Sequence, residues 1–254
     1  MLLKRIIPTL LINNNKLIHR SSFDQATDIY VGDPINTINI FNHYEVDEMM
    51  IVDVSNKADQ SFDYDFLKAL SGEAFFPLSY SGGIKNPDNA KKIISSGFEK
   101  IVVNSLLINN PNLVLKIINE IGSQSVIASI NIYSKKNNYF IYDHKNKKTI
   151  NIIFEKFIDN VLALNTGEIF VTHVNLDGNM YGFDSKLVQI LNKLIDKPII
   201  FKGGCENYQD LKKLFEYNIS AVSSSSVFIM KKKNGGVVIN YPNYEEKMKI
   251  YGNM

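Results

Sequence analysis

The stretch Ser81-Gly82-Gly83-Ile84-Lys85-Asn86 decides how the chain is interpreted, because a close copy returns 121 residues later as Lys202-Gly203-Gly204-Cys205-Glu206-Asn207. Each copy follows a short apolar run typical of a strand and precedes a pattern typical of a helix. Paired glycines at the end of a strand let the backbone approach a ligand closely, and the helix that follows presents free N–H groups to an anion. The two copies therefore predict two phosphate-sized anion sites at equivalent places in the fold.

Short β-rich runs alternate with amphipathic helical patterns along the chain. The predicted strands span residues 4–11, 48–53, 75–80, 100–104, 125–131, 168–173, 198–202 and 221–224. Eight strands with helices between them predict a single α/β domain, a (β/α)8 TIM barrel, with an open doubly wound sheet as the structural alternative. We expect long loops at the C-terminal face over residues 13–32 and 133–149, and the second has the alternation of a small hairpin. Residues 241–254 are expected to form a tail outside the barrel.

An internal repeat extends beyond the two glycine motifs. Ile7-Pro8 aligns with Ile127-Ala128 at an offset of 120 residues, and Asn104-Ser105 aligns with Ser225-Ser226 at an offset of 121. Matches that keep their order and a nearly constant spacing indicate two half-barrels, at about residues 1–120 and 121–240, of four βα units each.

Composition excludes several classes of protein. The chain has 28 basic and 26 acidic residues, a net charge of +2 and no long block of one sign, so a nucleic-acid surface is not indicated. The single cysteine, Cys205, excludes an intrachain disulfide framework and fits a reducing compartment. Charged residues interrupt the apolar start, and no apolar run is long enough to span a membrane. We therefore expect a cytoplasmic protein without a membrane span, and we predict neither a metal nor a cofactor.

With the repeat established, the chain resembles the cyclase subunit of imidazole glycerol phosphate synthase, the HisF-type barrel, from Met1 to about Phe228. The motifs that carry the resemblance are Leu2-Leu3-Lys4-Arg5-Ile6-Ile7, Gly32-Asp33-Pro34, Val46-Asp47-Glu48, Ser81-Gly82-Gly83-Ile84, Gly167-Glu168-Ile169, Asn175-Leu176-Asp177-Gly178 and Ser226-Val227-Phe228. In that family the barrel binds a substrate with a phosphate at each end. A glutaminase subunit docks on the opposite face, and ammonia passes through the barrel to drive ring closure.

The resemblance implies two sets of phosphate-binding residues. One set is Gly83, Asn104, Ser105, Asp177 and Gly178, and the other is Gly203, Gly204, Ser225 and Ser226. Backbone amides and small hydroxyls suit phosphate oxygens because they donate hydrogen bonds without bulk. The alternative is that these glycines and serines only form turns.

The sequence departs from the family at its two catalytic carboxylates, which are aspartates at the ends of strands one and five. The aligned residues are Leu11 and Asn131. Leucine cannot transfer a proton, and asparagine cannot act as a base near neutral pH. A lysine that the family uses near its substrate aligns with His19. The serine expected before the second Gly-Gly is Lys202, which either holds a different anion or is a solvated side chain.

Asp53 and His173 are candidates for an acid–base pair of another kind. They end predicted strands two and six at equivalent positions of the two halves, 120 residues apart. The alternative is that the two side chains only hydrogen-bond to each other at the mouth of the barrel.

The other end of the barrel keeps the charges of the family. Glu48, Lys100 and Glu168 each begin an even-numbered strand and should enter one interior layer, to which the fourth even strand adds Ser220. Two buried carboxylates and an ammonium are costly unless the charges pair, and Arg5 can complete two pairs. In the family these four charged positions form a gate at the ammonia entrance. The alternative is an ordinary set of ion pairs at the barrel base.

Three functions compete. The first is an ammonia-conducting or scaffolding subunit of a glutamine-dependent amidotransferase. It resembles barrels encoded with bacterial surface-polysaccharide genes, which accompany a HisH-like glutaminase and an ATP-dependent enzyme that amidates or amidinates a sugar. Glu99 aligns with an acidic residue that the family places at the glutaminase interface. The second is a working cyclase of histidine biosynthesis, a lyase, which Leu11 and Asn131 disfavour. The third is an independent phosphosugar-binding enzyme that uses Asp53 and His173, and it would not need the four charges.

Overall fold

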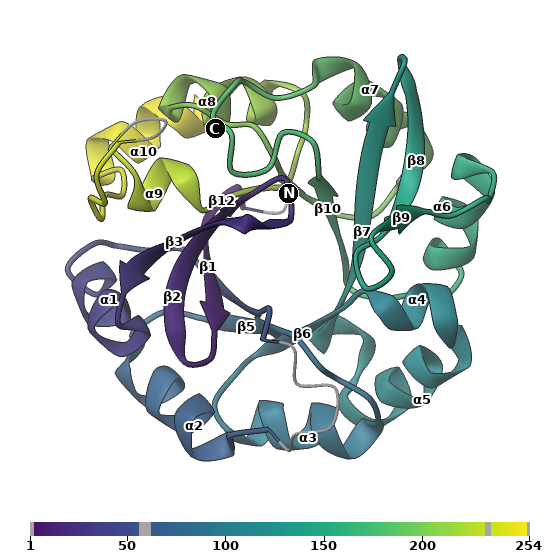
Figure 1. Cartoon of the computed structure of the whole chain (residues 1–254), viewed down its shortest axis with the longest axis horizontal. Coiled ribbons are helices and arrows are strands. Elements are labelled where there is room, and N and C mark those ends of the chain that lie inside the picture. The colour runs from purple at the N-terminus through teal and green to yellow at the C-terminus, as the bar shows by residue number, and fades with distance from the viewer. Residues whose placement is uncertain (1–2, 56–61, 232–234, 253–254) are drawn as a thin grey trace.

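The computed structural model describes residues 3–55, 62–231 and 235–252. Met1, Leu2 and the last two residues of the expected tail lie outside the described residues. A closed barrel of parallel strands stands at the centre, and helices surround it (Figure 1). The barrel strands are β1 (Arg5–Asn13), β4 (Met49–Asp53), β5 (Leu78–Ser81), β6 (Lys100–Val103), β7 (Val126–Lys135), β10 (Glu168–His173), β11 (Ile199–Lys202) and β12 (Ala221–Ser224).

Parallel pairing closes the ring. Each barrel strand pairs with the next one in chain order. The two halves join where Ile101 of β6 pairs with Val126 of β7 and where Arg5 of β1 pairs with Ala221 of β12. The predicted (β/α)8 barrel is therefore confirmed, and the open sheet is excluded.

Most of the described helices start at a side chain that caps them. The helices are α1 (Pro34–Phe41), α2 (Tyr64–Glu73), α3 (Pro87–Ser95), α4 (Ser105–Asn109), α5 (Pro111–Ile121), α6 (Phe154–Leu162), α7 (Ser185–Leu194), α8 (Tyr208–Glu216), α9 (Ser226–Ile229) and α10 (Tyr244–Tyr251). The exceptions are α4, α6 and α9. Asn86 and Asn207, which end the two glycine motifs, accept the N–H groups of Asn89 and Gln209. The asparagine of each motif is thus an N-cap, so part of the repeat has a purely structural cause. Within the described ranges, no helix is long and apolar enough to cross a membrane.

Alternation along the strands sorts buried side chains into two layers. One layer packs between the strands and the helices. The other fills the barrel and consists of Ile7, Met50, Val102, Ile127, Phe170, Ile200 and Ala221. The inward residue at the start of β12 is therefore Ala221, and the expectation for Ser220 is wrong. The expectation for Ser220 uses a repeat offset of 120 residues, whereas the offset at this strand is 121, as at the glycine motifs. Lys100 therefore corresponds to Ala221, and a difference of one residue puts the side chain on the opposite face of the strand.

Two antiparallel extensions rise above the C-terminal end of the barrel. The expected loop over residues 13–32 is instead a continuation of β1 that pairs with β2 (Lys16–Ser21), and β2 pairs with β3 (Asp24–Gly32). The hairpin expected within residues 133–149 is confirmed, since β7 continues into a pairing with β8 (Asn138–Asp143), and β8 pairs with β9 (Lys148–Thr149). The extensions leave from equivalent strands of the two halves, so the repeat includes them.

The C-terminal segment belongs to the barrel. Helix α10 lies in the outer ring between α8 and α1, where Figure 1 shows it in yellow. Just before it, the Tyr241 side chain is buried, packs on the Phe41 ring and donates a hydrogen bond to the carbonyl of Ile6 at 2.9 Å. The expectation of a tail outside the barrel is therefore wrong, because α10 is the last helix of the ring.

Candidate functional site

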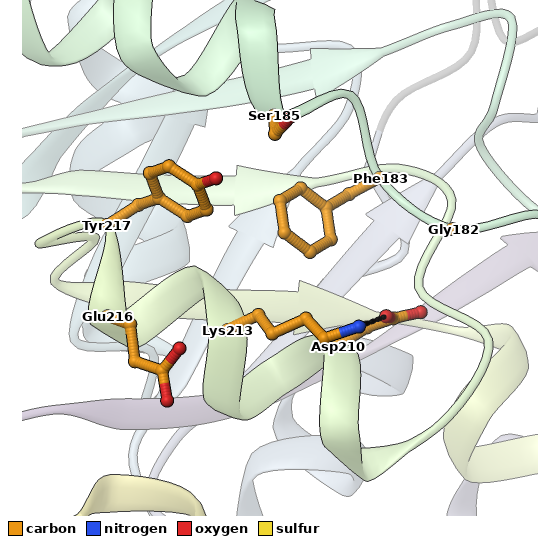
Figure 2. A pocket seen from close by; sticks show the side chains of 7 residues that line it. All are labelled: Gly182, Phe183, Ser185, Asp210, Lys213, Glu216 and Tyr217. Atoms are coloured by element: carbon orange, nitrogen blue, oxygen red, sulfur yellow. Dashed lines mark ion pairs between the residues drawn. The ribbon is translucent and has the colours of Figure 1, made fainter.

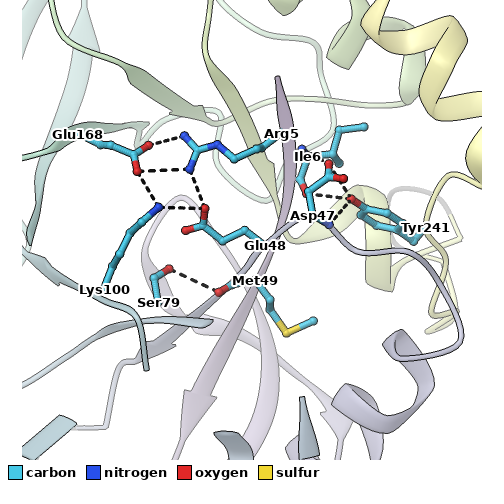
Figure 3. Close-up of polar contacts among 9 residues, drawn as sticks. All are labelled: Arg5, Ile6, Asp47, Glu48, Met49, Ser79, Lys100, Glu168 and Tyr241. Carbon is cyan, nitrogen blue, oxygen red and sulfur yellow. Dashed lines mark hydrogen bonds and ion pairs between the residues drawn. The ribbon is translucent and has the colours of Figure 1, made fainter. Parts of the chain in front are cut away.

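Four charged side chains form a closed ring inside the N-terminal end of the barrel (Figure 3). We name this set, Arg5, Glu48, Lys100 and Glu168, the N-terminal charge ring. The Arg5 guanidinium contacts Glu48 at 2.7 Å and also pairs with Glu168, while the Lys100 ammonium contacts Glu48 at 3.2 Å and Glu168 at 2.7 Å. Each cation therefore bridges both carboxylates, and the contacts are those that the sequence predicts.

Ion pairing offsets the effect of burial on the pKa of two members of the N-terminal charge ring, Arg5 and Glu168. Burial alone would raise the pKa of Glu168, but hydrogen bonds and the charges of Arg5 and Lys100 lower it overall. The same contacts raise the pKa of Arg5 against the opposing effect of burial. Two positive and two negative charges cancel, so the ring is a neutral, polar constriction, and the apolar barrel interior begins directly behind it.

Leu11 and Asn131 lie at the opposite end, which we call the C-terminal mouth, on the inward side of β1 and β7. Both side chains are buried. The Asn131 amide donates to the Asn104 side-chain oxygen at 3.3 Å, and His144 Nδ1 lies 2.9 Å from the same oxygen. An amide–amide–imidazole chain thus stands where the family resemblance implies a carboxylate.

A second buried ion pair occupies the same mouth. The Lys202 ammonium contacts the Asp177 carboxylate, and both side chains are about 95% buried, with exposed fractions of 5% and 6%. Buried polar atoms without a hydrogen-bond partner are found on His19, at Nδ1, and on Ser225, at Oγ. Lys202 is therefore not a solvated side chain, and the mouth holds a charge pair that the sequence alone does not reveal.

The two glycine turns differ in the space around them. Gly83 is exposed, and a Cβ atom there would meet only the Phe62 ring at 3.6 Å. Gly204 is buried, its carbonyl accepts the N–H of Gly182 at 2.8 Å, and a Cβ atom there would lie 2.1 Å from the Gly182 carbonyl oxygen. The first turn is open, whereas the β10–α7 loop covers the second.

The predicted phosphate residues are distributed differently from the two sets that the sequence suggested. Gly83, Asn104 and Ser105 lie together at the ends of β5 and β6. Asp177 instead pairs with Lys202, so it and Gly178 lie beside the second set, Gly203, Gly204, Ser225 and Ser226. The cause is the order of the ring, in which β10 neighbours β11 and β7 separates it from β6. Phosphate binding at either set stays a prediction.

The structure does not place Asp53 and His173 as a pair. They end β4 and β10, which stand four strands apart in the ring, and both continue the outward-facing side of their strands. Tyr80 donates a hydrogen bond to Asp53 at 3.2 Å, and His173 Nε2 lies 3.0 Å from Ser134 Oγ. Gly82 and Gly203 need to be glycine partly because a Cβ atom would strike the carbonyl oxygens of these two residues, at 2.6 and 2.8 Å. The hypothesis of a shared acid–base pair in the mouth is therefore wrong.

Burial lowers the pKa of His19 and His173. A histidine whose pKa is depressed by folding stabilises the folded state above its unfolded pKa of about 6.5, and that contribution is lost as the pH falls. We therefore expect the urea midpoint to fall between pH 7 and pH 5. His173→Gln should reduce this dependence, because it removes one of the two buried imidazoles. A midpoint that stays constant over this interval would contradict the prediction.

A surface pocket of about 470 Å³ lies between α7 and α8, and Gly182 of the loop that covers the second glycine turn lines one side of it (Figure 2). Phe183 and Tyr217 pack edge to face along it, and Lys213 lies 3.8 Å from Asp210. Lys213 and Asp210 are one helix turn apart on α8, and the carboxylate of Glu216 also lines the pocket. In the part of the chain that the structure describes, no group of three His, Cys, Asp or Glu side chains could hold a metal.

Sequence reasoning missed His144 and the partner of Lys202. His144 lies in the turn between β8 and β9. Only the fold of the β7–β8–β9 extension brings that turn to Asn104. Locally, the sequence Asp-His-Lys-Asn at residues 143–146 indicates only a tight turn, because an aspartate at the first position favours one.

Comparison with known proteins places these features in a family context. The family model described as histidine biosynthesis protein matches residues 5–234. A protein of Leptospira interrogans, provisionally named imidazole glycerol phosphate synthase subunit HisF, is 35% identical over 99% of this chain and its own full length. A Pseudomonas aeruginosa protein provisionally named subunit hisF2 is 34% identical over 95% of this chain and 97% of its own length. The imidazole glycerol phosphate synthase subunit HisF of an Exiguobacterium species is 27% identical over 89% of this chain and 88% of its own length.

Proposed function

Because the chain belongs to the histidine biosynthesis protein family, as a relative of imidazole glycerol phosphate synthase HisF subunits, we propose that it conducts ammonia within a glutamine-dependent amidotransferase and has lost the cyclase reaction. A glutaminase of the HisH type supplies the ammonia. The nitrogen acceptor belongs to a separate ATP-dependent enzyme, and a bacterial surface sugar is the substrate class that the sequence resemblance favours.

The observation that carries this proposal is the contrast between the two ends of the barrel. The N-terminal charge ring is complete, and each of its cations bridges both carboxylates. At the C-terminal mouth, Leu11 and Asn131 stand at the two positions where proton-transfer groups would be needed. The charge ring at the entrance is ordered, and the proton-transfer groups needed for ring closure are missing. This combination favours a role in conducting ammonia over a role in ring closure.

The interior between the ends suits a small neutral molecule. The layer that fills the barrel, which includes Ile7 and Phe170, is apolar. The next layer toward the mouth carries hydroxyl groups, and there Thr9 and Ser223 hydrogen-bond to each other. An ammonium ion would lose its hydration in the apolar layer, whereas ammonia would lose far less. Such a layer favours the passage of ammonia and excludes its charged form.

The face around the N-terminal charge ring is the proposed docking surface for the glutaminase. Glu99 is exposed at its rim, directly beside Lys100 of the ring. A donor enzyme must cover this face, because ammonia released elsewhere would be lost to solvent.

Lys100→Ala tests the proposal. Removing the ammonium leaves Glu48 and Glu168 with one cation between them, which breaks a buried network at a cost of about 3–5 kcal/mol and opens the constriction. We expect the reconstituted complex to release glutamate at a normal rate while the ratio of aminated product to glutamate falls several-fold. The measurement counts both products in the same reaction, for wild type and variant.

Lys91→Ala is the matched control, because the Lys91 ammonium pairs with Glu120 on the exposed surface at 2.8 Å. It should leave the product-to-glutamate ratio unchanged. If Lys100→Ala stays folded, binds its glutaminase and keeps full coupling, the N-terminal charge ring is only structural and the proposal fails.

A further inference from the structure

His144 is held over the C-terminal mouth by a rigid turn. The buried Asp143 carboxylate accepts the backbone N–H groups of Lys145 at 3.0 Å and Asn146 at 3.2 Å, and the Asn146 side chain donates to it at 2.6 Å. Three hydrogen bonds to one carboxylate fix the backbone on both sides of His144. These bonds order the backbone that carries His144, and the contact of its Nδ1 with the Asn104 oxygen places the imidazole.

Hydrogen bonds fix which nitrogen of His144 carries the proton. The Asn104 amide nitrogen donates to the carbonyl oxygen of Ser129 at 2.6 Å, so the other atom of that amide is its oxygen. That oxygen also accepts from the Asn131 amide at 3.3 Å. It can only accept, so His144 Nδ1, 2.9 Å away, must be the donor. In a neutral imidazole the Nε2 atom then carries the lone pair.

The surroundings of the His144 imidazole lower its pKa and so favour its neutral form. Desolvation lowers its pKa, Lys145 lowers it further, and Asp143 opposes both. These two are the charged groups that act on it, and the packed strands contribute the uncharged Asn104 and Asn131.

We propose that His144 is the proton acceptor of the C-terminal mouth, oriented by Asn104, and that it acts on nitrogen leaving the barrel. The inference rests on the proposed function. Ammonia forms a C–N bond to an electrophilic carbon of the acceptor, which the ATP-dependent partner has joined to a leaving group. The nitrogen then bears a positive charge, one N–H proton moves to the lone pair of His144 Nε2, and the leaving group departs with its bonding electrons. Asn104 orients the imidazole by accepting a hydrogen bond from Nδ1, in the way that a third group orients the base in many nucleophile–base pairs.

The first test reads the tautomer directly in the full chain. Nitrogen NMR of the chain labelled at its four histidines should show His144 with Nδ1 protonated and Nε2 unprotonated, with His144→Gln identifying its signals. Free imidazole side chains in water favour the opposite tautomer, so the result is diagnostic. Asn104→Ala should return His144 to the Nε2-protonated form. A wild-type chain with a proton on Nε2 near pH 7.5 would overturn the inference.

The second test reads nitrogen transfer in the reconstituted complex. Proton transfer by one positioned base contributes about 10²–10⁴-fold, so His144→Ala should lower aminated product at least about 10²-fold while glutamate release stays normal. Added imidazole should restore part of the loss, which a purely structural role would not allow. His43→Ala, at an exposed histidine away from the mouth, should match wild type.

The outcomes separate the two proposals. A wild-type complex that transfers no nitrogen overturns the proposed function, and the role of His144 as a base falls with it. A wild-type complex that transfers nitrogen, with His144→Ala equally active, overturns the inference about His144 alone. Loss of activity that imidazole does not restore, together with the Nε2-protonated tautomer, makes His144 a structural residue.

Discussion

The purified chain should cyclise the histidine-pathway intermediate of its family, with ammonium salt as the nitrogen source, at least about 10²–10⁴-fold more slowly than a relative with both aspartates. The reason is chemical. Position 11 offers a methyl group and position 131 offers an amide, and neither exchanges a proton near neutral pH. The measurement is product formation at saturating ammonium, which removes the glutaminase from the assay.

Leu11→Asp with Asn131→Asp provides the matched comparison. Asn131→Asp restores a carboxylate at this position and removes the hydrogen bond that the Asn131 amide donates to the Asn104 oxygen at 3.3 Å, because an ionised carboxylate can only accept. We expect at most a trace of cyclase activity in the double variant, and urea unfolding must show that it remains folded. A wild-type chain with the turnover of its catalytic relatives would show that displaced groups perform the reaction.

Lys202→Met should destabilise the folded chain by about 3–5 kcal/mol, because it leaves the Asp177 carboxylate buried without its partner. Methionine keeps most of the length of the side chain, so the change removes the charge with little loss of packing volume. Urea unfolding at constant pH measures the difference in free energy.

Replacing both partners should recover most of that loss. Lys202→Met with Asp177→Leu removes the two charges together, and buried pairs replaced by apolar residues are often neutral or stabilising. Lys213→Met is the surface control, since its ammonium is largely exposed and lies 3.8 Å from Asp210. It should cost no more than about 1 kcal/mol. Equal effects of Lys202→Met and Lys213→Met would show that the Lys202 pair is not buried in solution.

Strand identity could be predicted from the sequence because it depends on local patterns. The sequence predicts the strand over Glu168–His173 with the bounds that the structure shows, and the repeat identifies the two Gly-Gly turns. The N-terminal charge ring was predicted for the same reason, since residues that begin alternate strands of a closed barrel enter one layer.

Two expectations about which side chains face into the barrel differ from the structure by a single residue of register. Ser220 was expected inside the barrel and Ala221 is there, because the repeat offset is 121 residues at that strand. Asp53 and His173 were expected in the mouth, and they continue the side of β4 and β10 that faces the helices. A shift of one residue moves a side chain to the other face of a strand, and composition does not record which face is inward.

The sequence by itself determined the barrel, its two halves and the four charges of the N-terminal ring, because periodicity and spacing along the chain encode them. Only the tertiary structure decided the contacts of the C-terminal mouth. Lys202 meets Asp177 across 25 residues, and His144 meets Asn104 across 40. Both contacts join loops and extensions whose paths depend on the packing of neighbouring strands. Such contacts form only when the strands close into a barrel, and no local pattern in the sequence specifies them.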